Sequence, residues 1–527
     1  MDEFVKVAAT TKIHTHPYGG SMRSRLQTIA GVLLVLMPLT AGCNLSQWCH
    51  NGFKVGPDYH QPCTATAQNW IDAGNPYINS AAPNDAMWWQ TLNDPVLNGL
   101  ICTAYRQNLT LRVAGFRIME ARAQRNIAAG ELFPQTQQAT GSYTRINNSV
   151  NAPAIAPPYN FDQWQVGTNL AWELDFWGRF RRAIEAADAT VDASVESYDD
   201  VLVLLLSEVA QNYVDVRTAE ERLEYARRNV ETQRQSVDLA NLKFTNGATT
   251  RLDVTQGEST LGQTEALMPP LESQRRLAMN QLCILLGVPP HDINDVLNGR
   301  QPIPVTPPEV ALGIPADLLR RRPDIRRAER EVAAQSARIG VATSELYPHF
   351  SITGAIYLDA ANFKDLFSSN SFGGSIGPSF NWNILNYGRL VNGIRVQDAR
   401  FQQLAVTYQN VVLQANAEVE NGVVQFLNAQ RQVNFLTAST RAAEQSVELV
   451  RSQYDAGKTD FNRVLTVEQA LTQQQDQLAV ARGSVVQYLV QIYKALGGGW
   501  QLRLDNSANP TAAAIAQPTE LVPVSAQ

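Results

Sequence analysis

A long internal repeat constrains this chain more than any other feature of its sequence. The stretch LDFWGR at 174–179 returns as ILNYGR at 384–389. Three pairs of glycines keep one separation of 210 positions, namely Gly178 and Gly388, Gly247 and Gly457, and Gly287 and Gly497. The prolines of GELFP and SELYP, Pro134 and Pro348, lie 214 positions apart. Such constant spacing predicts a tandem duplication of one long unit, with a small shift in a loop before Gly178.

Each copy contains segments that alternate between apolar and polar residues, as β-strands do. The clearest segments are 163–176 and 372–384; a third strand is expected at 349–358 and a fourth, poorer in apolar residues, at 136–145. A soluble, half-buried sheet would explain the alternation. Strands of about ten residues with aromatic ends favour a membrane sheet, with lipid on the apolar face.

Four strands are too few for one chain to close a membrane barrel. An open sheet edge leaves backbone groups unpaired in lipid, and about eight strands form the smallest common barrel. We therefore expect several copies of the chain to share one barrel.

Long helices are expected after the strands. Residues 179–246 contain neither glycine nor proline, and 389–456 match them in length. One continuous helix of this length would reach about 100 Å. Each helix should turn at Gly247 or Gly457 and return as a second helix. The strand-helix joints would lie at Gly178 with Arg179 and at Gly388 with Arg389. Shorter helices are expected at 109–132 and 324–346, each stopped by a proline.

The N-terminus has the layout of a secretory signal peptide. Arg23 and Arg25 precede an apolar run at 26–39, and small residues lead to Cys43. The stretch LTAGC resembles a bacterial lipobox, in which the cysteine carries the lipid of the mature protein; a signal peptide with an incidental cysteine is the alternative. Asn44 is not the aspartate typical of inner-membrane retention, which implies the outer membrane.

Composition and residue spacing argue against several other classes of protein. A net charge of −6 with 17% charged residues gives no basic footprint for nucleic acid. Cys49, His50, His60 and Cys63 match no common zinc spacing, so no metal site is predicted. The sequence shows no nucleophile with a base and an orienting group, and no glycine-rich phosphate loop. We therefore predict no enzyme, and no cofactor except a covalent lipid on Cys43.

Six stretches along the mature chain resemble the outer-membrane factor family, the TolC-like channels. The resemblance is strongest to the lipoprotein branch that serves resistance-nodulation-division efflux pumps. The stretches are LTAGC, VGPDY at 55–59, WWQTLNDPVLNGL at 88–100, LDFWGR, LLRRRPDIRRAE at 318–329 and YDAGKTDFNRVL at 454–465. The resemblance implies a mixed α+β membrane protein. In it, three chains give four β-strands each to a twelve-stranded outer-membrane β-barrel, which a long periplasmic α-helical barrel continues.

The resemblance also implies a function. The homotrimer would be a passive conduit of a tripartite efflux pump, exporting small molecules such as drugs. Its partners would be the lipid bilayer, a periplasmic adaptor (membrane fusion) protein and an inner-membrane resistance-nodulation-division transporter. The outer-membrane conduit of a type I protein secretion system is the first alternative. A non-channel coiled-coil surface lipoprotein is the second.

The turns at Gly247 and Gly457 would form the periplasmic tip, where such channels close and adaptors dock. The gate candidates are Asp455, Asp460 and Arg463, because rings of carboxylates can pair with nearby basic groups; capping a helix is the alternative role of either carboxylate. The candidates for adaptor docking are Gly247, Leu252, Asp253 and Val254 at the first turn and Gly457, Val464 and Leu465 at the second. The arginines of RRRPDIRRAER could bind phosphate, but Pro323 and Asp324 favour a helix start.

These patterns predict six segments. They are a signal peptide at 1–42 with Met22 as an alternative start, a lipidated N-terminal segment and equatorial region at 43–107, a first repeat at 108–287, a proline-rich equatorial linker at 288–321, a second repeat at 322–497 and a disordered C-terminal tail at 498–527.

Overall fold

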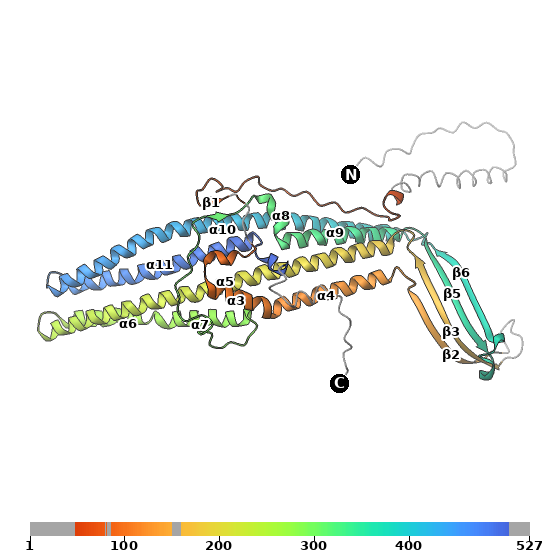
Figure 1. Cartoon of the computed structure of the whole chain (residues 1–527), viewed down its shortest axis with the longest axis horizontal. Coiled ribbons are helices and arrows are strands. Elements are labelled where there is room, and N and C mark those ends of the chain that lie inside the picture. The colour runs from red at the N-terminus through yellow and green to blue at the C-terminus, as the bar shows by residue number, and fades with distance from the viewer. Residues whose placement is uncertain (1–47, 80, 82–85, 150–159, 505–527) are drawn as a thin grey trace, which may run out of the picture.

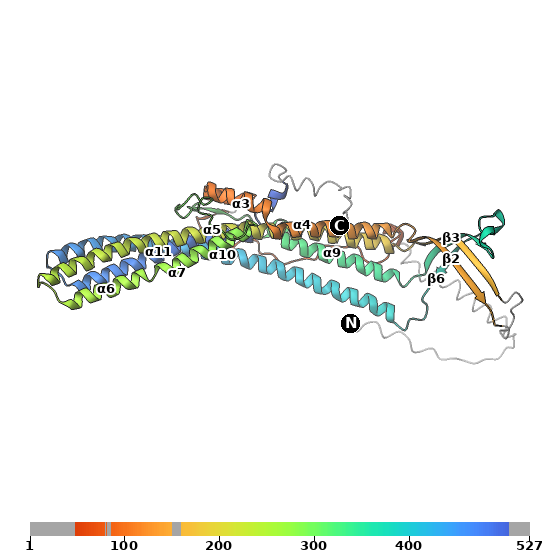
Figure 2. The same cartoon turned by 90° about the horizontal axis from the view of Figure 1, so that it is seen from below.

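The fold is elongated, with a β-sheet at one end and the tips of long helices at the other (Figure 1). This computed structural model describes residues 48–79, 81, 86–149 and 160–504. The predicted signal peptide, Met22 and Cys43 lie outside the described residues, as does 505–527. A view turned about the long axis keeps the sheet and the helical tips at opposite ends (Figure 2).

Four antiparallel strands form the larger sheet, in the order β2-β3-β5-β6. Their bounds are Thr136–Asn147 for β2, Asn160–Leu174 for β3, His349–Ala360 for β5 and Phe372–Asn381 for β6. All four predicted strands are confirmed, including the one that is poor in apolar residues. Within the described residues, β2 and β6 each have one edge without a partner strand.

Two strands end earlier than the apolar pattern predicts. The pattern extends to Phe176 and to 384, but β3 ends at Leu174 and β6 at Asn381. In the first copy, the carboxylate of Asp175 accepts hydrogen bonds from the backbone N–H groups of Phe180 (2.9 Å) and Arg181 (3.2 Å). These bonds satisfy donors at the start of the next helix, which takes Asp175 out of the strand ladder.

The two long helices are continuous and equal in length. α5 spans Arg179–Thr245 and α10 spans Arg389–Asp455, with 67 residues each. The second returning helix, α11, is also continuous over Phe461–Ala495, whereas the first is broken into α6 (Arg251–Glu265) and α7 (Met268–Leu285). Pro269 and Pro270 explain the break, because proline lacks an N–H group and clashes with the preceding turn.

The predicted shorter helices are α4 (Leu109–Gly130) and α9 (Pro323–Ser344). No helix in the described part of the chain is long and apolar enough to cross a membrane. The remaining elements are short and lie mostly around the middle of the helices and beside the sheet. They are β1 (Ile78–Asn79), η1 (Trp88–Leu92), α3 (Pro95–Gln107), β4 (Val310–Ala311), η2 (Pro315–Asp317), α8 (Leu318–Arg321), η3 (Phe363–Asp365), η4 (Ser369–Ser371) and η5 (Trp500–Leu504).

The duplication extends to individual side-chain contacts. The indole Nε1 of Trp172 donates to the backbone oxygen of Leu132 at 3.2 Å, and that of Trp382 donates to the oxygen of Leu346 at 3.0 Å. The donors lie 210 positions apart and the acceptors 214, as the two sequence offsets require. Each bond ties the base of a strand to the turn after a shorter helix.

The largest apolar core lies in the middle of the helices, where α3, η1 and η5 pack on α5 and α11. Trp88 of η1 stacks on Tyr493 of α11 with 5.3 Å between ring centroids. Residues 498–504 are the described part of the predicted C-terminal tail, and they pack on the helices. They are held because Leu502 is buried in the core and Arg503 Nε lies 2.6 Å from Asp199 Oδ1.

The arginine-rich stretch before α9 is part of this architecture. Arg322 Nη1 donates to the backbone oxygen of Ala495 at 2.8 Å and lies 2.7 Å from Glu418 Oε2. Arg326 lies 2.6 Å from Glu196 Oε2 and over the ring of Trp500. Carboxylates of the same chain therefore occupy these arginines, which supports the structural interpretation over a phosphate site.

Candidate functional site

Two turns form the end of the molecule farthest from the sheet, and they have the same geometry (Figure 1). Gly247 and Gly457 adopt φ values of +72° and +68°, which favour glycine. The next residue in each turn donates its N–H to a carbonyl of the preceding helix: Ala248 to Lys243 and Lys458 to Gln453, both at 2.8 Å. Both long helices thus end in the same glycine-dependent turn.

A small apolar cluster joins the two turns. Its members come from α5, α6, α10 and α11, which brings both helical hairpins together; they are Ala240, Val254, Val450, Tyr454, Phe461, Val464 and Leu465. Phe461 is 1% exposed, and its ring lies 3.1 Å from the position that a Cβ on Gly257 would occupy. Gly257 therefore permits the close approach of α6 to α11.

The candidate docking residues divide between the surface and this cluster. Val254, Val464 and Leu465 are buried at 6%, 1% and 6% exposure. These three side chains pack the tip together and present no surface to a partner in this conformation. The sequence pattern missed this because each residue was read on its own hairpin.

Other docking candidates remain accessible at the tip. Leu252 is 62% exposed. Gly247 and Gly457 are exposed, while Asp253 is half-buried and accepts a hydrogen bond from Thr249 Oγ1. The accessible part of the candidate docking site therefore consists of the two glycine turns and Leu252.

The three gate candidates lie beside the second turn. Asp460 is the N-cap of α11, and its Oδ1 accepts the backbone N–H of Arg463 at 2.9 Å. Asp455 is the last residue of α10, and its side chain is exposed, as is that of Arg463. Within the chain, Asp460 and Arg463 are therefore linked through a helix cap, the alternative that the sequence left open.

Lys243 connects the two hairpins, although no sequence motif marked it as a contact residue. Its Nζ donates from the last turn of α5 to the backbone oxygens of Tyr454 and Asp455, the latter at 3.2 Å. The same ammonium lies 4.2 Å from the centre of the Tyr454 ring. A cation at the carbonyl end of α10 is favourable for the helix dipole. The equivalent position in the second copy is Gln453, so a difference between the repeats was the available signal.

Two ionisable groups near the tip are perturbed by burial. Burial raises the pKa of the Tyr454 phenol, and the charge of Asp253 acts in the same direction. Burial also raises the pKa of the Glu468 carboxyl, which accepts a hydrogen bond from Ser236 Oγ at 2.6 Å. Glu468 lies on α11 and Ser236 on α5, so this carboxyl sits in the contact between the two hairpins.

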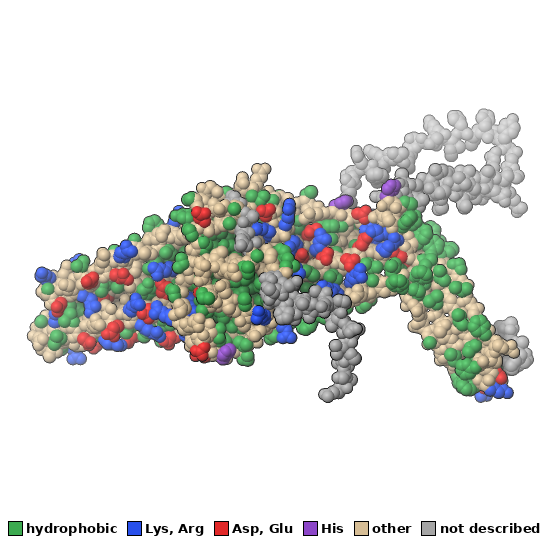
Figure 3. Space-filling view, viewed as in Figure 1, with side chains coloured by type: hydrophobic (Ala, Val, Ile, Leu, Met, Phe, Trp, Pro, Cys, Tyr) green, Lys and Arg blue, Asp and Glu red, His purple; other side chains and the backbone are tan. Residues whose placement is uncertain are grey.

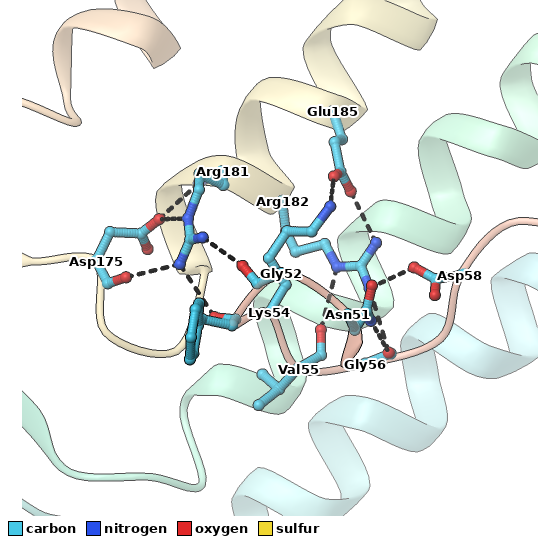
Figure 4. A network of polar contacts seen from close by, with 11 residues as sticks. Asn51, Gly52, Lys54, Val55, Gly56, Asp58, Asp175, Arg181, Arg182 and Glu185 are labelled. Carbon is cyan, nitrogen blue, oxygen red and sulfur yellow. Dashed lines mark hydrogen bonds and ion pairs between the residues drawn. The ribbon is translucent and has the colours of Figure 1, made fainter. Parts of the chain in front are cut away.

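The first strand-helix joint is fastened to an N-terminal strap, residues 48–59 (Figure 4). Arg181 Nε lies 2.7 Å from Asp175 Oδ2, and its Nη1 and Nη2 donate to the backbone oxygens of Gly52 (2.6 Å) and Phe53 (3.0 Å). Gly178 has φ +79°, and a Cβ there would lie 2.8 Å from the Lys54 Cα. Glycine is therefore required both by the turn and by the strap.

Arg182 makes the second set of contacts with the strap. It is 3% exposed, and its guanidinium donates to the backbone oxygens of Val55 (3.1 Å) and Gly56 (3.3 Å) and to Asp58 Oδ1 (3.1 Å). The carboxylate of Glu185 forms ion pairs with both Arg182 and Lys54. The motif VGPDY thus folds onto FWGRFRR through backbone carbonyls, which a sequence pattern does not reveal.

The two joints differ in how much of them the chain covers. Arg179 lies 3.1 Å from Glu173 Oε1 and 3.5 Å from Glu345 Oε1 at the first joint. At the second joint, Gly388 has the same φ of +79°, and Tyr387 beside it is 96% exposed. Arg389 begins α10 there. In the part of the chain that the structure describes, the strap contacts the first joint and not the second.

One face of the sheet is rich in hydrophobic side chains. Figure 3 shows hydrophobic side chains gathered over the strands, whereas charged side chains are scattered over the helices. Ile376 and Phe380 of β6 are 80% and 69% exposed. In the described residues, no group of three or more His, Cys, Asp or Glu side chains is arranged to hold a metal ion.

Comparison with known proteins agrees with this geometry. A family model described as "Outer membrane efflux protein" matches residues 100–288 and 314–498. Nodulation protein T of Rhizobium leguminosarum bv. viciae is 28% identical over 450 residues, which cover 85% of this chain and 90% of that protein. The pyoverdine export outer membrane protein OpmQ of Pseudomonas aeruginosa is 29% identical over 427 residues, covering 80% of this chain and 89% of OpmQ.

The fold is also that of a solved channel. The structure of the outer-membrane channel OprN is similar with a TM-score of 0.80 and 30% sequence identity, and the match covers 85% of this chain and 99% of OprN. The family match spans both repeats, including the shorter helices, the strands and the long hairpins. The chain belongs to the outer membrane efflux protein family.

Proposed function

We propose that three copies of this chain form the outer-membrane channel of a tripartite efflux pump that exports small molecules. The observation that carries this proposal is the four-stranded sheet, which exposes large apolar side chains and, among the described residues, has two edges without a partner strand. Lipid does not tolerate unpaired edges, so a sheet of this kind needs partners to span a membrane.

The edges allow closure by identical copies. β2 and β6 lie at opposite edges, and the sheet is antiparallel throughout. With four strands in alternating directions, β6 of one copy meets β2 of the next in antiparallel orientation. Three copies then give a closed barrel of twelve strands, in line with the family to which the chain belongs.

A lipid on Cys43 would anchor the assembly near the strand-helix joints. Trp48, five positions after Cys43, packs on Phe176 and Trp177 with ring centroids 5.3 and 5.4 Å apart. Aromatic side chains of this kind favour the membrane interface. The strap would therefore hold the lipid anchor beside the end of the barrel where the strands pass into the periplasmic helices.

The tip would carry the gate and the adaptor site. Three copies would bring Asp455, Asp460 and Arg463 around one axis, where carboxylates could select cations or pair with basic groups of a neighbour. Gly247, Leu252 and Gly457 are accessible for an adaptor. Asp253, Val254, Val464 and Leu465 would support these turns from within.

Photo-crosslinking in living cells tests the proposed partners. A photoreactive residue in place of Lys458, which is exposed beside Gly457, should capture a periplasmic adaptor of a resistance-nodulation-division pump. The matched control replaces Phe367, which is 69% exposed beside the strands at the other end of the molecule, and should not capture the adaptor. Capture of an ATP-driven protein exporter at position 458 would instead assign the chain to type I protein secretion.

A further inference from the structure

The duplication gives α5 and α10 equivalent positions, but among the described residues only α5 is covered on both sides. Within the chain, α5 packs against α9 in the half near the sheet and against α11 in the half near the tip. The same side of α10 carries exposed residues, including Val406 at 62% and Phe435 at 76% exposure. By the repeat, the helices that should cover it are the equivalents of α9 and α11, namely α4 and the pair α6 and α7.

We propose that a neighbouring copy covers this side of α10 in the same register that α9 and α11 take on α5. The inference rests on the proposed trimer and adds which residues meet across its interface. Each contact within the chain predicts one contact between copies. A residue of α5 or α11 is replaced by its equivalent 210 positions away on α10, α6 or α7, and a residue of α9 by its equivalent 214 positions earlier on α4.

A reversed ion pair is the first observation that supports this register. Within the chain, Arg482 Nη1 of α11 lies 2.8 Å from Glu221 Oε1 of α5. The equivalent positions are Glu272 on α7 and Arg431 on α10, so both charges change sign together. Both side chains are exposed in the single chain. The register therefore places Arg431 opposite Glu272 of the neighbouring copy, with the charges still complementary.

These two residues have only weak or local contacts inside the chain. Glu272 Oε1 lies 3.9 Å from Arg227 Nη2, with both side chains 60% exposed. Arg431 Nη2 donates to Asn428 Oδ1, three positions earlier on the same helix. Neither contact joins the two hairpins, so both residues are accessible to a neighbouring copy.

A second polar pair fits the same register. Ser236 Oγ of α5 donates to Glu468 Oε1 of α11 at 2.6 Å. The equivalent positions are Ser446 on α10 and Glu258 on α6, which are the same residue types. Both are exposed in the single chain, whereas Ser236 and Glu468 are buried at 2% and 3% exposure. Because Glu258 and Glu272 lie 14 positions apart, as do Glu468 and Arg482, one register satisfies both pairs.

In the half near the sheet, ion pairs between α9 and α5 have uncharged equivalents on both α4 and α10. Arg327 lies 3.4 Å from Asp200, and their equivalents are Val113 on α4 and Asn410 on α10. Val113 is 50% exposed. An isolated charge against an apolar residue would be unfavourable, so the joint loss indicates that the positions face each other.

The next turn of the helix shows the same joint change. Arg330 lies 4.0 Å from Asp192, and their equivalents are Phe116 and Gln402. Phe116 is 61% exposed in the single chain. Two pairs do not follow this rule. Arg326 pairs with Glu196, but their equivalents are the charged Arg112 and the uncharged Val406. Arg222 pairs with Asp476, and their equivalents are Gln432 and Ala266.

Thiol crosslinking in the full-length protein tests the register. In a background with serine at Cys49, Cys63 and Cys102, Ser446→Cys with Glu258→Cys should join copies through a short bifunctional thiol reagent and give covalent trimers. Ser236→Cys with Glu468→Cys is the positive control, because the reagent should link these two thiols within one chain. The denatured product should then have the mass of a single chain. Ser446→Cys with Glu272→Cys is the negative control, because the shift of 14 residues moves one thiol about 21 Å along the helix.

Charge reversal gives a second test without cysteines. Arg431→Glu should lower the fraction of trimer in mild detergent several-fold, Glu272→Arg should do the same, and the double variant should recover the wild-type fraction. A trimer that forms without the 446–258 link, while the 236–468 control links, would overturn the register and leave the assembly intact. A monomer in native mass measurements would overturn both the register and the proposed trimer.

Discussion

Removing the charge of Lys243 should loosen the periplasmic tip. In Lys243→Met, the backbone oxygens of Tyr454 and Asp455 lose their ammonium donor, and the Tyr454 ring loses the cation at 4.2 Å. A hydrogen bond to a charged group contributes about 1.5–3 kcal/mol, and a partly exposed cation–π contact about 0.5–1 kcal/mol. Because Lys243 is half-buried and the contributions are not additive, we expect a loss of about 1–3 kcal/mol in the contact between the hairpins.

That loss corresponds to about a 5- to 150-fold increase in the population with separated tips. Hydrogen–deuterium exchange of the full-length protein in detergent should detect it in the last turn of α10 and in the turn at Gly457, whose N–H bonds to Tyr454 at 3.0 Å. In planar bilayers, the same variant should spend a larger fraction of time conducting.

Matched variants distinguish the loss of the Lys243 contact from a general destabilisation of the tip. Gln453→Met changes the equivalent residue of the second turn and should leave the exchange rate unchanged. Lys243→Arg keeps the charge, and its exchange rate should lie between those of the wild type and Lys243→Met. If Lys243→Met exchanges at the same rate as the wild type and as Gln453→Met, Lys243 does not hold the hairpins together.

Three further predictions follow from the joints and the tip. Gly178→Ala should lower the melting temperature more than Gly388→Ala, because both have φ +79° but only Gly178 meets Lys54; equal melting temperatures would refute the role of the strap. Burial raises the folded-state pKa of Glu468 above its ordinary value of 4.5, so stability should fall as pH rises above about 4.5. Glu468→Gln should remove this part of the pH dependence of the melting temperature, while a change at the exposed Glu448, Glu448→Gln, should not. Asp460→Asn keeps the helix cap but removes the charge, whereas Asp460→Ala removes both; a change in cation selectivity with Asp460→Asn alone would support a gate ring, and unchanged conductance in both variants would exclude it.

The repeat allowed much of the fold to be predicted, because local signals recur in both copies. Glycine at 247 and 457 marks turns with positive φ, and uninterrupted stretches between the glycines predict long helices of equal length, as observed. The alternating apolar pattern located three strands, and the match between the copies located the fourth, which is poor in apolar residues. The pattern placed the end of β3 too late because it does not register that Asp175 bonds to the start of the next helix.

Contacts between distant segments could not be predicted in the same way. Arg181 and Arg182 bind backbone oxygens of residues more than 120 positions away, and backbone oxygens carry no sequence signature. Val254 and Leu465 were expected on a docking surface, but their burial depends on the other hairpin. Differences between the copies, such as Lys243 against Gln453, carried information that the similarities did not.

Several copies of this chain should share one closed barrel, and native mass spectrometry of the full-length protein, extracted from membranes in mild detergent, can count them. We expect a single species of three chains, each with one lipid-modified cysteine at position 43. A monomer that remains folded and soluble in the same detergent would contradict this expectation, because the edges of β2 and β6 would then need no partner.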